Sequence, residues 1–73
     1  MKCLVCKDMN IDGHCITGYL IQLHGKNSFQ PFAKSAAIVF ETNESAYEAG
    51  ELTGMPFKVI PYEDPGYHMQ VVI

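Results

Sequence analysis

The dipeptide Asp12-Gly13 lies between two apolar runs and constrains the fold more than any other feature of the sequence. Residues 1–7 are short and apolar, and residues 14–24 are rich in β-branched and aromatic side chains. Both compositions are typical of strands. Asp-Gly favours a tight turn because both residues tolerate positive φ. The sequence therefore predicts a β-hairpin whose turn lies within residues 10–13.

The same stretch also resembles the beginning of a calcium-binding loop. Asp8, Asn10, Asp12 and Gly13 match the first, third, fifth and sixth positions of the twelve-residue EF-hand loop. The twelfth position is Tyr19, which cannot supply the bidentate carboxylate that the loop requires. The flanking segments also have strand rather than helix composition. We therefore favour the hairpin and expect calcium to bind weakly or not at all.

The rest of the chain divides into short apolar segments separated by turn residues. Residues 25–31 contain Gly, Asn, Ser and Pro and predict a loop, whereas residues 35–40 (SAAIVF) predict a third strand. Residues 57–62 (FKVIPY) predict a fourth strand, and residues 67–73 (YHMQVVI) a fifth. Pro and Gly within residues 63–67 predict a tight turn between the last two strands.

A helix is predicted between the third and fourth strands. Thr42 is a suitable N-cap, and Glu44 lies in the first turn, where the helix dipole favours an anion. Gly54 and the following Pro56 predict its end. The element order is β-β-β-α-β-β, which predicts an α+β fold: one small antiparallel sheet with one helix packed on one face. We expect residues 1–73 to form a single small domain.

Charge and composition exclude several classes of function. The net charge is −3, no arginine is present, and the few lysines are scattered, so direct nucleic-acid binding is not expected. No glycine-rich phosphate loop occurs, and no apolar run approaches the ~20 residues that cross a bilayer. The odd number of cysteines, 3, and the lack of a signal sequence predict a reduced, cytoplasmic protein.

Cysteines and a histidine near the N-terminus suggest one metal site. Cys3 and Cys6 form a C-x-x-C pair, and the hairpin would bring His14 and Cys15 back toward the first strand. On an extended strand, however, Cys3 and Cys6 point to opposite faces. Buried cysteines also serve as small apolar core residues. We favour the core role and expect no bound metal, with the zinc cluster as the alternative.

No arrangement of side chains points to catalysis. The serines lack the flanking residues of a nucleophile elbow, and His24 and His68 are isolated from carboxylate or nucleophile partners in the sequence. No cofactor motif is present. We therefore predict a protein that is not an enzyme and uses no cofactor.

Acidic residues are concentrated in the second half of the chain and predict a protein-binding surface. Three glutamates recur at i, i+4 and i+7 and share one face of the predicted helix. A tyrosine lies beside them, and two further acids lie at the predicted turn. Such a surface suits a partner protein with a basic surface. The predicted contact residues are Glu44, Tyr47, Glu48, Glu51, Glu63 and Asp64.

The segment Ala37–Tyr62 resembles a recurring segment of short phage and prophage accessory proteins. In these proteins a strand that ends in Ala-x-x-Phe-x-Thr leads into a helix with an early alanine. The matching residues are Ala37, Phe40, Thr42 and Ala46, and the strand FKVIPY follows. Some of these proteins resemble anti-CRISPR and other anti-defence proteins, which bind a host complex.

This resemblance implies a phage or mobile-element interaction protein that acts by stoichiometric protein–protein binding in the host cytoplasm. The acidic surface would then inhibit a host complex that binds nucleic acid. Two alternatives remain. One is a zinc-binding module that uses Cys3, Cys6, His14 and Cys15, and the other is a homodimeric structural subunit that pairs through residues 67–73.

Overall fold

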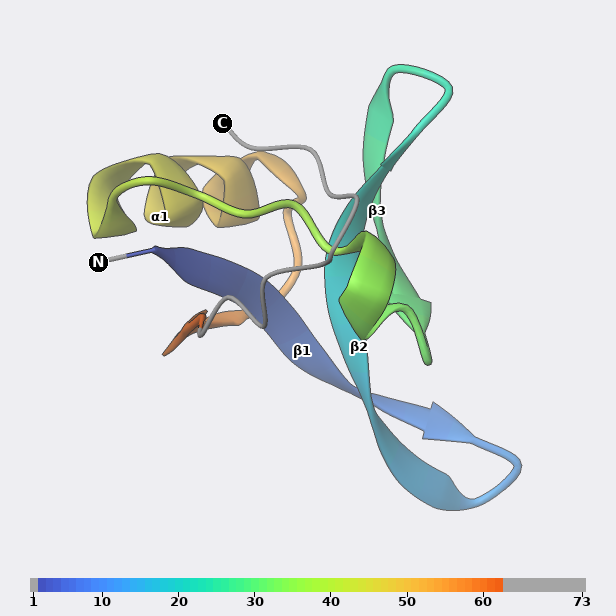
Figure 1. The fold of residues 1–73 in the computed structure, drawn as a ribbon. Helices are drawn as coiled ribbons and strands as arrows, with labels where there is room; N and C mark the ends of the chain where they lie inside the picture. Colours follow the sequence, from blue (N-terminus) through green and yellow to red (C-terminus); the bar gives the residue numbers. More distant parts are fainter. Residues whose placement is uncertain (1, 63–73) are drawn as a thin grey trace.

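The structure is a computed structural model that describes residues 2–62. It consists of a twisted antiparallel sheet crossed by one helix (Figure 1). The sheet order is β3-β2-β1-β4, and α1 contacts β1 and β4. The α+β fold class predicted from the sequence is confirmed. In chain order the elements are β1 (Cys3–Ile11), β2 (His14–Leu23), β3 (Lys26–Pro31), the 3₁₀ turn η1 (Lys34–Ala36), α1 (Asn43–Leu52) and β4 (Lys58–Pro61).

The predicted hairpin forms between β1 and β2, where Ile11 pairs with His14. The two turn residues, Asp12 and Gly13, have φ of 52° and 82°. Positive φ at both positions defines the type I′ turn, whose twist matches that of the flanking strands. The side-chain oxygen of Asn10 accepts a hydrogen bond from the Gly13 N–H at 3.1 Å. The turn prediction is confirmed, and β1 extends further toward the turn, to Ile11, than the predicted strand over residues 1–7.

A second hairpin joins β2 to β3 at a position where the sequence predicted a loop. His24 and Gly25 have φ of 52° and 77°, and Leu23 pairs with Lys26 across the turn. Histidine is one of the non-glycine residues that adopt the left-handed region most readily. The loop predicted over residues 25–31 is therefore wrong. Cross-strand pairing with β2 overrides the low strand propensity of this segment.

The prediction of a strand over residues 35–40 is also wrong, although part of this segment is extended. Its first residues belong to the 3₁₀ turn. The remaining residues make isolated bridges, Ala37 to Ile21 of β2 and Phe40 to Cys3 of β1. Pairing between β1 and β2 ends at Cys6 and Tyr19. Beyond that pair, residues 37–40 form backbone hydrogen bonds to both strands, with Cys3 of β1 and with Leu20 of β2. These bonds are too few on either strand to form a continuous ladder.

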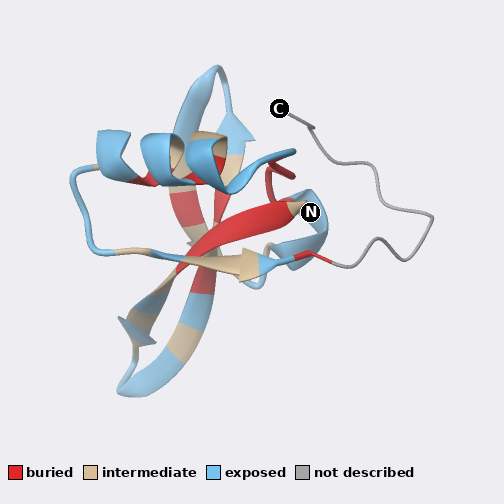
Figure 2. Cartoon of the chain, turned by 90° about the vertical axis from the view of Figure 1, so that its left-hand side faces the viewer, coloured by how far each residue is buried: buried red, intermediate tan, exposed pale blue. Residues whose placement is uncertain are grey.

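The first half of β1 is buried on both faces (Figure 2). On the α1 face, Cys3 and Val5 pack with Phe40 and Ala46. On the opposite face, a second cluster contains the buried residues Leu4, Ala37, Val39 and Tyr62. Strand β1 is therefore the shared centre of two apolar layers, and its side chains alternate between them.

Helix α1 begins as predicted at the Thr42 N-cap. The Thr42 side chain accepts the Ser45 N–H at 3.1 Å. The buried residues of α1 are Ala46 and Gly50. Gly54, beyond the end of the helix, has a positive φ of 71°. The predicted helix is thus confirmed, and β4 confirms the strand predicted over residues 57–62. The turn and last strand predicted over residues 63–73 lie outside the described residues.

Gly50 lets the Phe57 ring approach the helix closely. A Cβ at Gly50 would lie only 2.4 Å from the ring. We predict that Gly50→Ala lowers the free energy of unfolding by about 1 kcal/mol, because the overpacking cost of about 1–3 kcal/mol exceeds the helix-propensity gain of about 1 kcal/mol. Urea denaturation measures the change. In a Phe57→Leu background the same substitution is expected to be neutral or stabilising, and equal destabilisation in both backgrounds would contradict the packing argument.

Phe32 combines a highly exposed side chain with a left-handed backbone conformation, which is unfavourable for a bulky residue. Its side chain is 82% exposed and its φ is 59°, in the left-handed region. A bulky residue there costs about 1–2 kcal/mol, whereas asparagine tolerates the conformation. We predict that Phe32→Asn raises the free energy of unfolding by about 1 kcal/mol in urea denaturation. Leu52→Asn is the matched control, because Leu52 is also 82% exposed but ends a helix, and that variant is expected to be less stable than the native protein. A Phe32→Asn variant that is also less stable would refute the strain.

Candidate interaction surface

The outward face of α1 carries the acidic residues predicted as a contact surface. Glu44, Glu48 and Glu51 are all exposed and share this face, since α-helical residues at i, i+4 and i+7 lie in one row. Tyr47, beside the row, is 52% exposed, and its ring meets the Phe57 ring edge-on at 5.8 Å between centroids. That contact fixes the position of the tyrosine. We call Glu44, Tyr47, Glu48 and Glu51 the acidic face.

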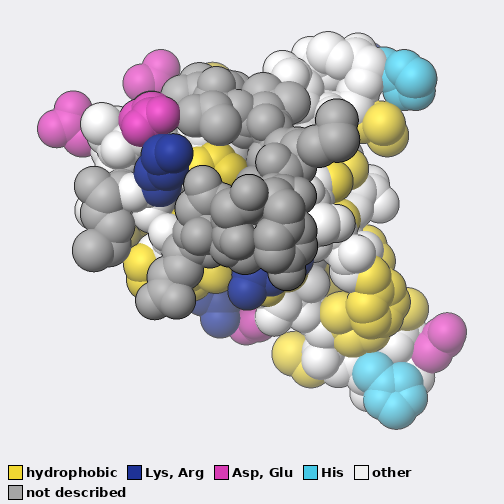
Figure 3. Space-filling view, viewed as in Figure 1, with side chains coloured by type: hydrophobic (Ala, Val, Ile, Leu, Met, Phe, Trp, Pro, Cys, Tyr) yellow, Lys and Arg dark blue, Asp and Glu magenta, His cyan; other side chains and the backbone are white. Residues whose placement is uncertain are grey.

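The carboxylates of the acidic face are not neutralised within the described part of the chain. No lysine among residues 2–62 forms an ion pair with Glu44, Glu48 or Glu51. Acidic side chains gather at the end of the molecule that α1 occupies (Figure 3). Like charges at i, i+4 cost a few tenths of a kcal/mol, whereas Glu44 in the first turn is favoured by the helix dipole. The remaining predicted contacts, Glu63 and Asp64, lie outside the described residues.

An exposed leucine adjoins the acidic face and was missed by the sequence analysis. Leu52 is 82% exposed at the C-terminal end of α1. Its position four residues after Glu48 was the available signal, since i and i+4 are neighbours on a helix surface. The glutamate row is therefore flanked by two large exposed side chains, Tyr47 within the acidic face and Leu52 at its edge.

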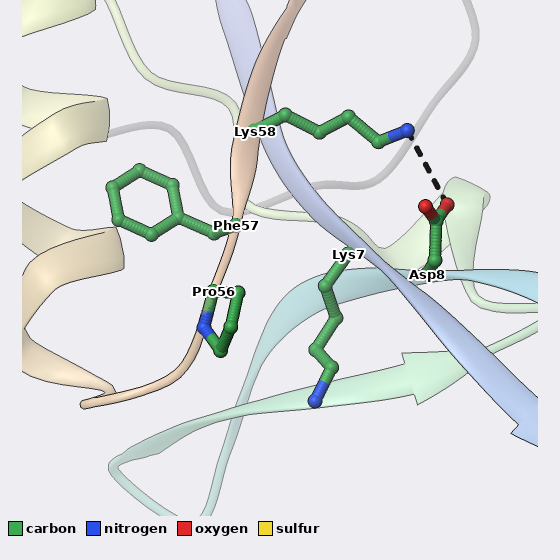
Figure 4. A pocket seen from close by; sticks show the side chains of 5 residues that line it. All are labelled: Lys7, Asp8, Pro56, Phe57 and Lys58. Atoms are coloured by element: carbon green, nitrogen blue, oxygen red, sulfur yellow. Dashed lines mark ion pairs between the residues drawn. The ribbon is translucent and has the colours of Figure 1, made fainter.

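A groove of about 350 Å³ on another part of the surface is lined by Lys7, Asp8, Pro56, Phe57 and Lys58 (Figure 4). Its two lysine side chains extend in different directions. The Lys58 ammonium pairs with Asp8 at 3.3 Å, and the Lys7 ammonium lies 3.5 Å from the Met55 sulfur. The two cations therefore do not converge on a common anion, and we assign the groove no ligand.

The residues that resemble the start of a calcium-binding loop have structural roles in and beside the β1–β2 hairpin. Asp8 pairs with Lys58 across the β1–β4 edge, and Asn10 bonds to the Gly13 N–H. Asp12 occupies the first turn position. The ligand-like spacing therefore belongs to a strand and a type I′ turn.

The structure does not bring the four zinc candidates together. Cys3 and Cys6 lie three residues apart on β1 and therefore point to opposite faces. Cys15 pairs with Asn10, four residues along β1 from Cys6, a separation of about 13 Å. His14 lies at the hairpin tip opposite Ile11. Within residues 2–62, no group of three or more His, Cys, Asp or Glu side chains could hold a metal ion.

The three thiols differ in burial and therefore in reactivity. Cys3 and Cys6 are buried, and Cys15 is exposed. Desolvation raises the pKa of the Cys3 and Cys6 thiols, partly offset at Cys6 by the nearby Lys58 ammonium. The Cys3 thiol also donates a weak hydrogen bond to the Thr42 carbonyl at 3.5 Å. These two thiols are therefore core residues with low reactivity.

We predict that a soluble thiol reagent at neutral pH modifies Cys15 rapidly, and Cys3 and Cys6 only when the protein unfolds. Mass spectrometry after timed labelling counts the modified thiols. Because the folded pKa of both buried thiols is raised, the unfolded chain loses their protons first as pH increases. Stability should therefore fall as pH rises past the ordinary thiol pKa. Rapid labelling of Cys3 or Cys6 in the folded protein would contradict the burial.

Among residues 2–62, no helix is both long and apolar enough to span a membrane. Comparisons of the chain with protein-family models, with curated protein sequences and with solved structures find no match.

Proposed function

We propose that this protein is a small, non-catalytic interaction protein that binds one partner stoichiometrically through the acidic face of α1. The observation that carries the proposal is the combination, on one helix, of exposed apolar side chains with exposed carboxylates that form no ion pair within residues 2–62. Tyr47 is 52% and Leu52 82% exposed beside the glutamate row. In protein interfaces, aromatic anchors supply most of the affinity, and charges at the rim supply steering and specificity.

The charge of the acidic face selects the class of partner. A helix with a row of exposed carboxylates attracts a basic surface and raises the association rate. Basic surfaces are typical of proteins that bind nucleic-acid phosphates. The partner would therefore be a nucleic-acid-binding protein or complex, and the acidic face would compete with nucleic acid for its site.

The resemblance of Ala37–Tyr62 to phage and prophage accessory proteins also supports a role as an interaction protein. It favours an inhibitor that acts on a host complex in the host cytoplasm, in the manner of anti-CRISPR proteins. Helix α1 and the residues before it belong to the resembling segment, so the acidic face lies within it.

The acidic face is tested by removing two of its charges. The variant Glu44→Gln/Glu51→Gln should bind a partner captured from host lysate about tenfold more weakly than the native chain and with a flatter salt dependence. Affinity capture with both chains, followed by titration of the purified partner at several salt concentrations, measures the difference. Competition with nucleic acid for the captured partner tests the inhibitory role.

The matched control is Asp12→Asn/Glu41→Gln, which changes the net charge equally but leaves α1 intact. Asparagine suits the left-handed conformation of Asp12, and Glu41 precedes the helix. Binding of this control should fall much less than binding of the helix variant. Equal weakening by both variants would mean that net charge alone matters, and no weakening by either would reject the proposed function.

A further inference from the structure

Helix α1 and the β2–β3 hairpin enclose a groove on the flank of the acidic face. The wide part of the groove, about 380 Å³, lies between Lys26 on the hairpin and the last turn of the helix. A narrow part, about 220 Å³, continues along the helix toward Ser45. The two parts share Asn27, Ala49 and Leu52. Residues of α1 and of the β2–β3 hairpin line both parts, so the two elements form the walls of the groove.

The narrow part combines apolar and polar groups that suit a long cationic side chain. Ala49 and Leu52 line it with aliphatic surface, and Phe40, which also borders it, is only 1% exposed. Glu48 and Asn27 also line it, and both supply oxygen acceptors. Aliphatic stems of arginine and lysine pack on apolar surface while their charged groups reach polar partners. Among the described residues, no lysine lines this part, whereas Lys26 lines the wide part.

The size of the narrow part also limits its occupant. Pockets for small-molecule ligands have volumes of about 300–1,000 Å³ and bury most of the ligand. At about 220 Å³ the narrow part is below this range and suits one side chain of a larger partner. Arginine fits its groups better than lysine, because a planar guanidinium pairs with a carboxylate such as that of Glu48 through two hydrogen bonds.

We propose that the narrow part of this groove receives an arginine side chain of the partner protein, with the guanidinium beside Glu48 and the aliphatic stem on Leu52. This inference rests on the proposed function and makes it specific. The acidic face attracts the basic partner, and the groove fixes its register. Lys26 repels a second cation from the wide end, so one arginine is accommodated in one orientation.

A titration of the isotope-labelled protein with a short capped peptide containing one arginine tests the inference, followed by NMR amide shifts. The control peptide carries citrulline, which has nearly the same shape but no charge. We expect saturable shifts at Asn27, Ala49 and Leu52 with the arginine peptide and at least threefold weaker binding of the citrulline peptide. Glu48→Gln should weaken arginine-peptide binding at least threefold, and Glu44→Gln, with the same charge change outside the groove, should weaken it less.

Two outcomes would overturn the inference. Shifts confined to Glu44, Tyr47 and Glu51, with equal effects of Glu44→Gln and Glu48→Gln, would show charge attraction without a groove site. The proposed function would then stand without the groove. Equal binding of the arginine and citrulline peptides would reject recognition of the cation and would also count against the charge-driven function.

Discussion

The first half of β1 is the constraint on which the rest of the structure depends. Its four residues from Cys3 to Cys6 are buried, and Cys3, Leu4 and Val5 contribute to apolar clusters on both faces of the strand. The strand bonds to β4 at one edge and to β2 and Phe40 at the other. A chain of 73 residues buries a smaller fraction of its surface than a large domain does. A strand covered on both faces lets this short chain form two apolar layers around one element.

This arrangement separates the residues that stabilise the fold from those available for binding. Ala46 and Gly50 turn the inner side of α1 toward β1 and β4, and their small size lets the helix approach closely. The outer side carries the exposed glutamates Glu44, Glu48 and Glu51. Charge substitutions on that side therefore probe binding with little effect on folding. Tyr47 links the two roles, because its contact with Phe57 anchors an exposed ring.

Features encoded by a few neighbouring residues were predictable from the sequence. Asp12-Gly13 specified its turn, and Thr42 and Gly54 specified the two ends of α1. The placement of β3 was not predictable in this way, because its strand state comes from pairing with β2 and its turn begins with a histidine. The extended segment after η1 occupies a gap that exists only once β1 and β2 diverge.

The same division applies to the candidate surfaces. Helical periodicity was sufficient to place three glutamates on one face of α1, since the spacing is local. The separation of Cys15 from Cys6 depended on the register of the hairpin, and the groove between Asn27 and Ala49 depended on a strand that the sequence did not indicate. Both features are consequences of tertiary pairing.

Contact between the partner and the outward face of α1 can be tested by hydrogen exchange, measured by mass spectrometry on the free protein and on its complex with the captured partner. If the partner binds this face, exchange should be slower over residues 43–55 in the complex, with little change over residues 8–17 at the β1–β2 tip. Slower exchange at the β1–β2 tip with none over α1 would contradict this contact.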